Sequence, residues 1–420
     1  MLLSVDLDTL ASSIAYSWLE NEVHHRQTIA LVRFDHADLA LRNENVYALG
    51  IAGLSDGANE LLYINDLPTR TPFPSQRLAL VDHNQLDSAF STDNQSAQVI
   101  AVIDHHEDEG LYKDTANPRI IAPVGSCASL VARLCPPTMP PGLALLLLSA
   151  ILIDTGGLKT GGKAVGEDRD AAIFLVPLSP VTAGIPATFL TPDGLQGASA
   201  IQDIYTELET KKVDVSNLGV WDLLRRDYKE YALRLPWVGP EVSIKAGLST
   251  VPLGLEAWIT EGKLEDVAKK WMDTKGLAVH GILTTYRDAN KPGKSGKGKH
   301  RREQLWIVSV GTESSGGSPV KLDDLVDRLF KGLEASKDLK LKRNKNFEID
   351  KKDKLPAGMK ARVYDQKNTD ASRKVTAPTL KRILEGEDQP SGVEPAEGDR
   401  KRMKAVRRMS TNVLALFRKS

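Results

Sequence analysis

The segment Val99-Ile100-Ala101-Val102-Ile103-Asp104-His105-His106 runs from five apolar residues straight into one acid and two histidines. A run this short and this rich in β-branched residues is typical of a strand that is buried on both faces of a parallel sheet. Ligands of open α/β sheets bind at the carboxyl ends of the strands. The sequence therefore predicts a site at the end of this strand, where the three polar groups can bind a metal ion or transfer protons.

Length, charge and cysteine content set broad limits on the protein. Its 420 residues exceed one typical domain, and its 55 basic and 55 acidic residues give a net charge of zero that favours no nucleic-acid partner. Cys127 and Cys135 form neither a disulfide framework nor a zinc motif, as in proteins of a reducing compartment. The apolar run 143–153 is too short to span a bilayer, and no signal peptide is apparent. We expect a cytoplasmic monomer without a transmembrane segment.

Acids follow apolar segments at four places in the first half of the chain. A single Asp at such a place is more often a helix cap or a turn residue, and a single buried His is more often a core residue than a ligand. Four places in one domain instead predict one convergent site, because massed carboxylates repel each other unless cations neutralise them. Carboxylates with imidazoles and no thiolates favour Mn²⁺, with Mg²⁺ as the alternative, over zinc, and the ligands suffice for two ions. The residues are Asp6, Asp8, Asp82, Asp104, His105, His106 and Asp154.

The predicted elements indicate an α/β fold. In the first part, a helix from Thr9, a helix opened by the N-cap Ser126 and a buried helix over 143–153 alternate with strands at 28–33, 61–64, 78–81 and 99–103. Such alternation predicts a doubly wound domain with a parallel sheet. In the second part, a smaller α/β domain with a mixed sheet is predicted from strands at 242–248, 278–285 and 305–310 and helices at 255–273 and 322–333. We expect a first domain at 1–195, a connecting helix in 196–214, a second domain at 215–385 and a disordered linker with a basic tail at 386–420.

The order and spacing of the acidic motifs resemble those of the DHH phosphoesterase superfamily. The matching motifs are Asp6-Leu7-Asp8, Asp82-His83-Asn84, Asp104-His105-His106 and a buried helix that ends in Asp154. The second domain carries Ser372-Arg373-Lys374, which is similar to the signature of the DHHA2 domain, and Ser249-Thr250-Val251-Pro252 is similar to another of its motifs. The DHH and DHHA2 domains occur together in family II inorganic pyrophosphatases and in fungal exopolyphosphatases.

The resemblance implies roles for individual residues. One metal ion would be held by Asp6 and Asp82, and a second by Asp8, Asp82, His105 and Asp154, with Asp82 between them. His106 would face the phosphate and donate a proton to the leaving group, while Asp104 would orient the histidines. Arg373 and Lys374 would bind phosphate oxygens from the second domain, with Lys229 as a less certain third cation. Without the motif, Arg373 and Lys374 would be taken for a solvated surface pair.

The sequence departs from the family at one position. The family has His or Asn four residues before the first acid of motif one, where this chain has Leu2. We expect that the chain begins downstream of the usual start and that its first strand is incomplete.

The substrate is predicted to be a phosphoanhydride. Length, insertions and the Gly125-Ser126-Cys127 segment resemble fungal exopolyphosphatases, which act on inorganic polyphosphate, more than family II pyrophosphatases, which act on pyrophosphate. The stretch 291–302 has six Lys or Arg residues and no acid, and we expect a mobile loop that either gathers the polyanion or has no role. The open alternatives are a pyrophosphatase, a catalytically impaired regulator that uses the basic tail 400–420 as an interaction module, and a phosphodiesterase or nuclease relative.

Overall fold

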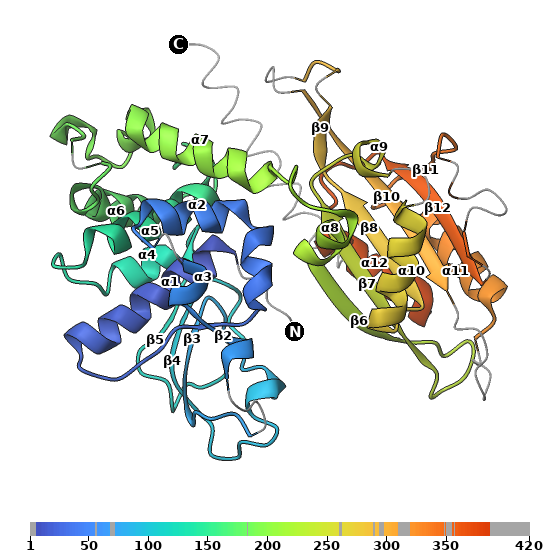
Figure 1. Ribbon diagram of the computed structural model, residues 1–420, viewed down its shortest axis with the longest axis horizontal. Coiled ribbons are helices and arrows are strands. Elements are labelled where there is room, and N and C mark those ends of the chain that lie inside the picture. Colours follow the sequence, from blue (N-terminus) through green and yellow to red (C-terminus); the bar gives the residue numbers. More distant parts are fainter. Residues whose placement is uncertain are drawn as a thin grey trace, which may run out of the picture. The chain divides into compact units, whose positions relative to one another are not determined.

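The computed structural model describes residues 6–54, 57–67, 72–182, 184–259, 263–288, 290–293, 298–309, 320–347, 349, 355–356 and 358–386. The chain divides into two compact units, Met1–Tyr228 and Lys229–Ser420 (Figure 1). Three features considered above lie outside the described residues: Leu2, the middle of the stretch 291–302, and the linker and tail from 387 onward. Within the described ranges, no helix combines the length and apolarity that a bilayer crossing requires.

The first unit consists of short parallel strands and a larger set of helices. Its strands are β1 (Leu31–Val32), β2 (Leu62–Tyr63), β3 (Arg77–Val81), β4 (Gln98–Asp104) and β5 (Arg119–Ile121). Its helices are α1 (Leu7–Trp18), α2 (Asn43–Ile51), α3 (Gly57–Glu60), α4 (Cys127–Ala132), α5 (Pro141–Thr155), α6 (Gly166–Leu175), α7 (Ser199–Val213) and α8 (Val220–Arg226).

The parallel strands place several carboxyl ends at one edge. Strands β3, β4 and β5 form a three-stranded sheet in that order, and β1 pairs with β2 in a second parallel sheet. Val81 is the register partner of Ile103, and Asp104 is the partner of Ile121. Because Val81 and Ile103 are neighbours, the residues that follow β3 meet the residues that end β4.

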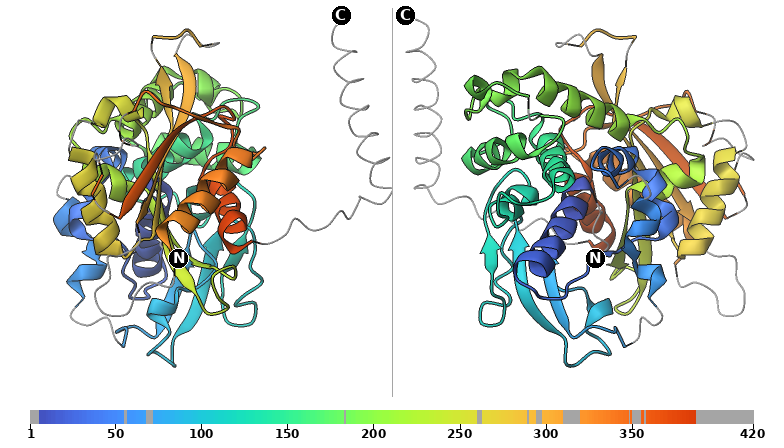
Figure 2. Two further views of the ribbon diagram at one scale, coloured as in Figure 1. Left: turned by 90° about the vertical axis from the view of Figure 1, so that its right-hand side faces the viewer. Right: turned by 60° about the vertical axis from the view of Figure 1, so that its left-hand side comes forward.

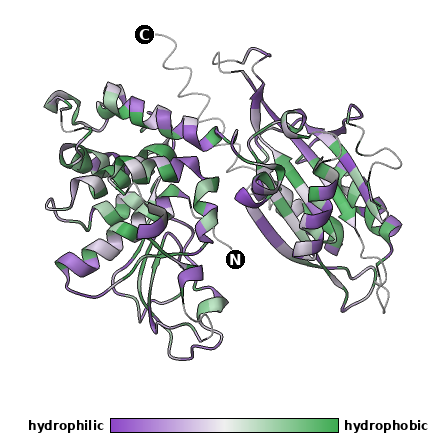
Figure 3. Ribbon diagram, viewed as in Figure 1, coloured by the Kyte–Doolittle hydropathy of each residue, from purple (hydrophilic) through white to green (hydrophobic). Residues whose placement is uncertain are grey.

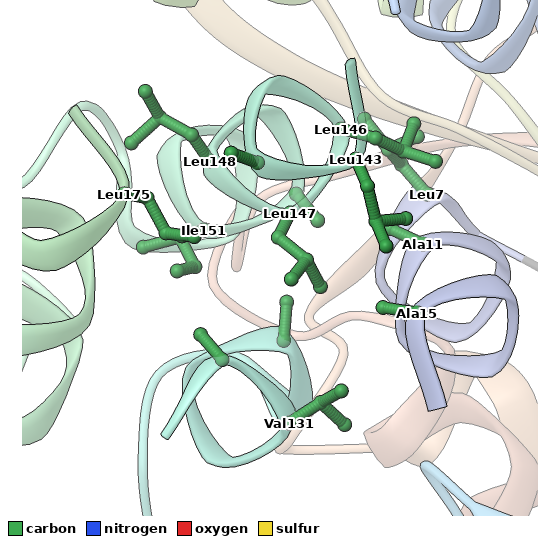
Figure 4. Close-up of a cluster of buried hydrophobic side chains, with 14 of the residues drawn as sticks. Leu7, Ala11, Ala15, Val131, Leu143, Leu146, Leu147, Leu148, Ile151 and Leu175 are labelled. Carbon is green, nitrogen blue, oxygen red and sulfur yellow. The ribbon is translucent and has the colours of Figure 1, made fainter. Parts of the chain in front are cut away.

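The core of the first unit is built around α5. This helix is apolar on all sides, so it is buried on all sides, and Leu145 to Leu148 have no exposed surface. Figure 4 shows its leucines packed between Leu7, Ala11 and Ala15 of α1 and Val131 of α4. The predicted buried helix thereby fixes α1 and α4 beside each other. Both helices begin at the candidate site.

The second unit is a mixed sheet between two layers of helices. Its strands are β6 (Tyr228–Arg234), β7 (Ser243–Val251), β8 (Val279–Thr284), β9 (Tyr286–Asp288), β10 (Lys299–Ser309), β11 (Leu341–Arg343) and β12 (Met359–Gln366). Its helices are α9 (Leu255–Trp258), α10 (Lys263–Lys275), α11 (Leu322–Ala335) and α12 (Arg373–Glu385). Together with the parallel sheets of the first unit, it confirms the predicted α/β class.

The strand order of the second unit is β11-β12-β10-β8-β7-β6, with β9 paired to β10. The β7–β8 pair is parallel, whereas β8–β10, β10–β12 and β11–β12 are antiparallel. Figure 2 shows α10 on one face of this sheet and α11 and α12 on the other. The central strands are accordingly rich in apolar residues, as their green colour in Figure 3 shows, and β8 is buried along its whole length.

The sequence predicted a loop over the basic stretch 291–302, but the structure places the end of this stretch in a strand. Lys299 to Arg302 belong to β10, and Lys299, His300 and Arg301 pair with β9. Basic side chains are tolerated in these strands because the β9–β10 ribbon extends past the part of β10 that pairs with β8. Charged residues are common on strands whose faces remain in water.

Candidate functional site

The ends of β3 and β4 bring Asp82 next to the Asp104–His106 segment. The backbone N–H of Asp82 donates to the carbonyl of Ile103 at 2.8 Å, which continues the ladder by one residue. Asp82 then turns out of the strand with φ +64°. This left-handed conformation is uncommon for a residue with a side chain, although Asp and Asn adopt it more readily than others. Such outliers gather at functional sites, where the surrounding structure enforces them.

The start of α1 adds two more acids. Asp6 is the N-cap of α1, and its Oδ1 accepts from the Thr9 N–H at 3.1 Å. The Thr9 hydroxyl lies within hydrogen-bonding reach of both Asp6 and Asp82. The beginning of α1 is thereby tied to the end of β3, and Asp6, Asp8 and Asp82 share one edge of the unit.

Asp8 is buried at the beginning of α4. Its Oδ2 accepts from the Cys127 N–H at 2.7 Å, and its Oδ1 accepts from the Ala128 N–H at 2.8 Å and from the Ser126 hydroxyl at 2.8 Å. Ser126 is the N-cap residue of α4 as expected, but its side chain does not cap the helix. The carboxylate of Asp8 satisfies the first N–H groups instead, where the helix dipole also favours a negative charge.

A second buried carboxylate, that of Asp168, holds the turn before α4. It accepts from the Gly125 N–H at 2.9 Å, the Ser126 N–H at 3.3 Å and the Ser129 hydroxyl at 2.7 Å. Gly125 has no room for a side chain, because a Cβ atom would lie 2.7 Å from both Asp168 Oδ2 and Thr155 Cγ2. Asp168 thus fixes the turn whose serine contacts Asp8.

His105 points its ring into the acids. Its Nε2 lies 3.2 Å from Asp82 Oδ1 and 3.8 Å from Asp8 Oδ2, while its Nδ1 hydrogen-bonds to the carbonyl of Val124 at 3.0 Å. Burial lowers the pKa of His105, but the hydrogen bond to Asp82 and the charges of Asp8 and Asp82 outweigh burial and raise the pKa to about 9. A proton on Nε2 supplies positive charge to the carboxylates around it.

Asp104 and Asn84 hold the second histidine in place. Asp104 is fully buried, and its Oδ1 accepts from the backbone N–H of His105 at 2.8 Å and from Nδ1 of His106 at 2.8 Å. Asn84 donates to the other oxygen of Asp104. The hydrogen bond to Asp104 raises the pKa of His106 and engages Nδ1 of a ring whose side chain is 59% exposed.

Asp154 completes the cluster from the last turn of α5. Gly156 ends that helix in the left-handed conformation, with φ +69°, which only glycine adopts without cost. Burial raises the pKa of Asp154 to about 6, and the charge of Asp6 adds to this effect. The pKa of Asp8 is also raised, first by burial and then by the charges of Asp82 and Asp154. The carboxylates therefore repel one another when no cation is present.

The donor set suits a divalent cation. Ligand atoms of Asp82, His105 and His106 lie within 4.8 Å of one another. Asp82 Oδ1 is buried and lies 3.2 Å from His105 Nε2 and 3.8 Å from His106 Nδ1. A buried anionic oxygen beside imidazoles and further carboxylates is a good position for a metal ion with oxygen and nitrogen ligands.

The remaining predicted site residues lie in the second unit. Lys229 lies in β6, and Arg373 and Lys374 form the first turn of α12, where the Ser372 hydroxyl caps the helix through the Lys374 N–H at 3.3 Å. Gln366 holds this turn, because its Nε2 donates to the carbonyls of Asn368 and Ala371 at 2.6 Å each. Gln304 Nε2 donates to Gln366 Oε1 at 2.7 Å, and Trp306 Nε1 donates to Gln304 Oε1 at 2.8 Å, so a chain of buried hydrogen bonds leads to this turn.

Sequence reasoning did not assign four residues that shape the site: Thr9, Ser126 as a partner of Asp8, Asp168 and Gln366. Asp168 is the third residue of a helix, where an acid usually bonds locally, so no pattern indicates its contact with 125–129. The Gly125-Ser126 pair at a helix start was the available hint, since small residues there permit a carboxylate to approach the first N–H groups.

Buried acids and imidazoles at the ends of parallel strands, in a chain that carries a second α/β unit, fit the phosphoesterase class that the motifs predicted. Residues 3–151 match the DHH family, N-terminal domain, and residues 206–383 match the DHHA2 domain. The chain belongs to this DHH family and carries both domains, as the motifs predicted.

Known relatives have names from two branches of the family. A Schizosaccharomyces pombe protein named "Putative exopolyphosphatase" is 30% identical over 309 residues, which cover 68% of this chain and 72% of that protein. A Shouchella clausii protein named "Probable manganese-dependent inorganic pyrophosphatase" is 32% identical over 286 residues, or 67% of this chain and 78% of that protein. The crystal structure of a Methanococcus jannaschii "putative family II inorganic pyrophosphatase" aligns with 89% of this chain at 18% identity and a TM-score of 0.48.

Proposed function

We propose that this hydrolase of the DHH family is an exopolyphosphatase, which hydrolyses the terminal phosphoanhydride bond of inorganic polyphosphate and releases orthophosphate. The observation that carries the proposal is the buried Asp82 Oδ1 facing His105 Nε2 at 3.2 Å within a cluster of carboxylates. The relative named as an exopolyphosphatase, which matches 68% of this chain at 30% identity, supports the choice of substrate.

The acids and His105 would hold two divalent metal ions, with Mn²⁺ preferred and Mg²⁺ as the alternative. Asp6 and Asp82 would hold one ion, and Asp8, Asp82, His105 and Asp154 the other. When bound, two such ions activate water and neutralise charge on the phosphoryl oxygens. Binding requires His105 to lose its Nε2 proton, because a metal ligand must be deprotonated.

His106 would act as the proton donor to the leaving phosphate. Its Nδ1 is engaged by Asp104, so Nε2 is the nitrogen that remains for substrate. The raised pKa of His106 favours the protonated ring, as a general acid requires. Asp104 would act by fixing the orientation of this ring, supported by Asn84.

Arg373 and Lys374 would bind the phosphate oxygens, with Lys229 as a third cation. The transition state of phosphoryl transfer spreads negative charge over the phosphoryl oxygens, so fixed cations contribute much of the stabilisation. Arg binds two oxygens with its planar fork, whereas Lys acts as a point charge.

Pyrophosphate is the second candidate substrate. The relative from Shouchella clausii, which is named as a manganese-dependent pyrophosphatase, is 32% identical over a similar part of the chain. Both activities would use the same acids and histidines, so the metal cluster does not distinguish them.

The test measures orthophosphate release by the purified chain in Mn²⁺ and then Mg²⁺, beside an Asp82→Asn variant. Asn also tolerates φ +64°, so this variant keeps the backbone while removing a charge from the cluster. Release by the wild type and a loss of about a thousandfold or more in the variant would support the proposal. A folded, Mn²⁺-bound chain that releases no phosphate from any phosphoanhydride would contradict it and favour a regulatory role.

A further inference from the structure

The β9–β10 ribbon of the second unit has two faces of different charge. Antiparallel pairing sets His300 opposite Arg287, and Arg301 opposite Tyr286. Side chains alternate along a strand, and directly paired residues share a face. Arg287, His300 and Arg302 therefore lie on one face, which we call the open face. Lys299, Arg301 and Asp288 lie on the other. The ribbon is hydrophilic, and Figure 3 shows it in purple where it projects from the sheet.

Positive charges crowd one another on the open face. The guanidinium groups of Arg287 and Arg302 donate to backbone carbonyls, of Gly298 at 3.3 Å and Thr369 at 2.7 Å. Across the described ranges, neither group has a carboxylate oxygen within 4.0 Å. Burial lowers the pKa of His300, and the charges of Arg302 and Arg287 lower it further, while Asp370 opposes them. The two arginines therefore lie close enough to act on one ring.

The opposite face is neutralised by contrast. Asp288 Oδ2 lies 3.4 Å from Nη1 of Arg301 and 3.7 Å from Nζ of Lys291. One carboxylate thus serves two cations on that face, and Arg301 has a partner that Arg287 lacks within 4.0 Å. A face on which cations outnumber the nearby anions is a favourable place for an anionic ligand, because the ligand relieves the repulsion between the cations.

The open face continues into the turn that carries Arg373 and Lys374. Arg302 binds the carbonyl of Thr369, which lies four residues before Arg373. The charge of Asp370 acts on both Arg302 and His300. The segment that leads into α12 is therefore joined to the open face at Arg302.

We propose that the open face of the β9–β10 ribbon, formed by Arg287, His300 and Arg302, binds the inner phosphate groups of a polyphosphate chain whose terminal phosphates bind at Arg373 and Lys374. This inference rests on the proposed function and adds the residues that select long chains. Pyrophosphate has no third phosphate group, so its binding at Arg373 and Lys374 leaves the open face unused. His300 and Arg302 are two residues apart, about 7 Å along a strand, so only an extended polyanion contacts the whole face.

The experiment compares Arg287→Gln with Arg301→Gln, which removes the same charge from the neutralised face. Binding of long-chain polyphosphate and of pyrophosphate to the full chain is measured in EDTA, where no turnover occurs, at low and at high salt. Arg287→Gln should weaken long-chain binding about fivefold at low salt, the effect of one charge at contact distance in water. The loss should shrink at high salt. Arg287→Gln should leave pyrophosphate binding unchanged. Arg301→Gln should leave the binding of both ligands unchanged.

Equal effects of the two variants, or equal effects on both ligands, would overturn the inference. Kinetic assays in Mn²⁺ separate this failure from a failure of the proposed function. A wild-type chain that hydrolyses long polyphosphate, with the same KM in Arg287→Gln and Arg301→Gln, contradicts the open face alone. A wild-type chain that hydrolyses only pyrophosphate contradicts the proposed substrate, whatever the binding data show.

Discussion

The backbone N–H of Cys127 donates to the carboxylate of Asp8 across 2.7 Å, although 119 residues separate them in the sequence. Asp8 therefore caps the beginning of α4 and also lies in the acidic cluster beside His105. A group that is shared between a helix start and a candidate metal site couples the packing of α4 to the geometry of the cluster. Residues that hold the start of α4 should then influence metal affinity without contacting the ion.

Asp168→Asn tests this coupling. The amide would present an NH₂ group to some of the N–H donors at Gly125, Ser126 and Val165, so these donors would lose their partner. We expect a loss of about 1–3 kcal/mol in the free energy of unfolding and about 10- to 100-fold weaker Mn²⁺ binding. Calorimetric titration with Mn²⁺ and denaturant unfolding measure the two effects. Asp170→Asn, exposed on the same helix, is the matched control, and equal Mn²⁺ affinity in both variants would refute the coupling.

The metal-free chain should lose stability as the pH rises from about 6.5 to 9. The pKa of His105 is raised from an ordinary value of 6.5 to about 9 in the folded state. A group with a raised folded-state pKa stabilises the fold below its unfolded-state pKa, and this contribution disappears as pH rises through the folded-state pKa. Asp154, with a pKa of about 6, adds a smaller decline between about pH 4 and 6.

Thermal unfolding in EDTA across this pH range measures the effect. Saturating Mn²⁺ should remove the decline above pH 6.5, because the ion replaces the proton on His105. His105→Gln should flatten the same window in EDTA. A decline of equal size in the wild type with and without Mn²⁺ would show that the cluster does not exchange protons for metal.

His106→Asn should separate proton donation from metal binding. Its Nδ1 lies 2.8 Å from Asp104 Oδ1 and 3.8 Å from Asp82 Oδ1, so its hydrogen bond is to Asp104. Mn²⁺ affinity should therefore remain within about twofold while kcat falls by about 10²- to 10⁴-fold. Steady-state kinetics and Mn²⁺ titration on the same samples provide both numbers. A parallel loss of Mn²⁺ affinity would instead make His106 a metal ligand.

Gln366→Leu should disturb the turn that carries Arg373. Gln366 is 5% exposed and donates to two carbonyls of the turn, and its own oxygen accepts from Gln304. Leucine would leave these groups without partners, at a cost of about 1–3 kcal/mol in the free energy of unfolding. If Arg373 and Lys374 bind phosphate, KM should rise while Mn²⁺ affinity stays constant. The control is Lys367→Gln, an exposed neighbour, and an unchanged KM in Gln366→Leu would contradict the positioning role.

The fold was predictable where the local pattern and the burial agree. The apolar run of β4 and the apolar helix α5 have periodicities that only buried elements show, and the structure places both in the core of the first unit. Strand β1 was expected over 28–33 but covers only Leu31–Val32, because propensity does not determine where a partner strand lies. The start of β10 was missed, since its basic residues depend on pairing with β9.

The acidic cluster was predictable because its members end elements that parallel topology brings to one edge. The partners of those acids were not. The contacts of Ser126 with Asp8 and of Asp168 with Gly125 join residues that are 118 and 43 positions apart, and no periodicity encodes such pairs. The short polar residues involved also serve as ordinary caps, so their local sequence predicts the helix start rather than the site.

The most direct test of the account is orthophosphate release in Mn²⁺ from long-chain polyphosphate and from pyrophosphate, at equal concentrations of terminal phosphate. The account predicts release from the long chains at a higher kcat/KM than from pyrophosphate, with loss of both activities in Asp82→Asn. Efficient hydrolysis of pyrophosphate with no release from long chains would contradict the exopolyphosphatase proposal and identify the protein as a pyrophosphatase.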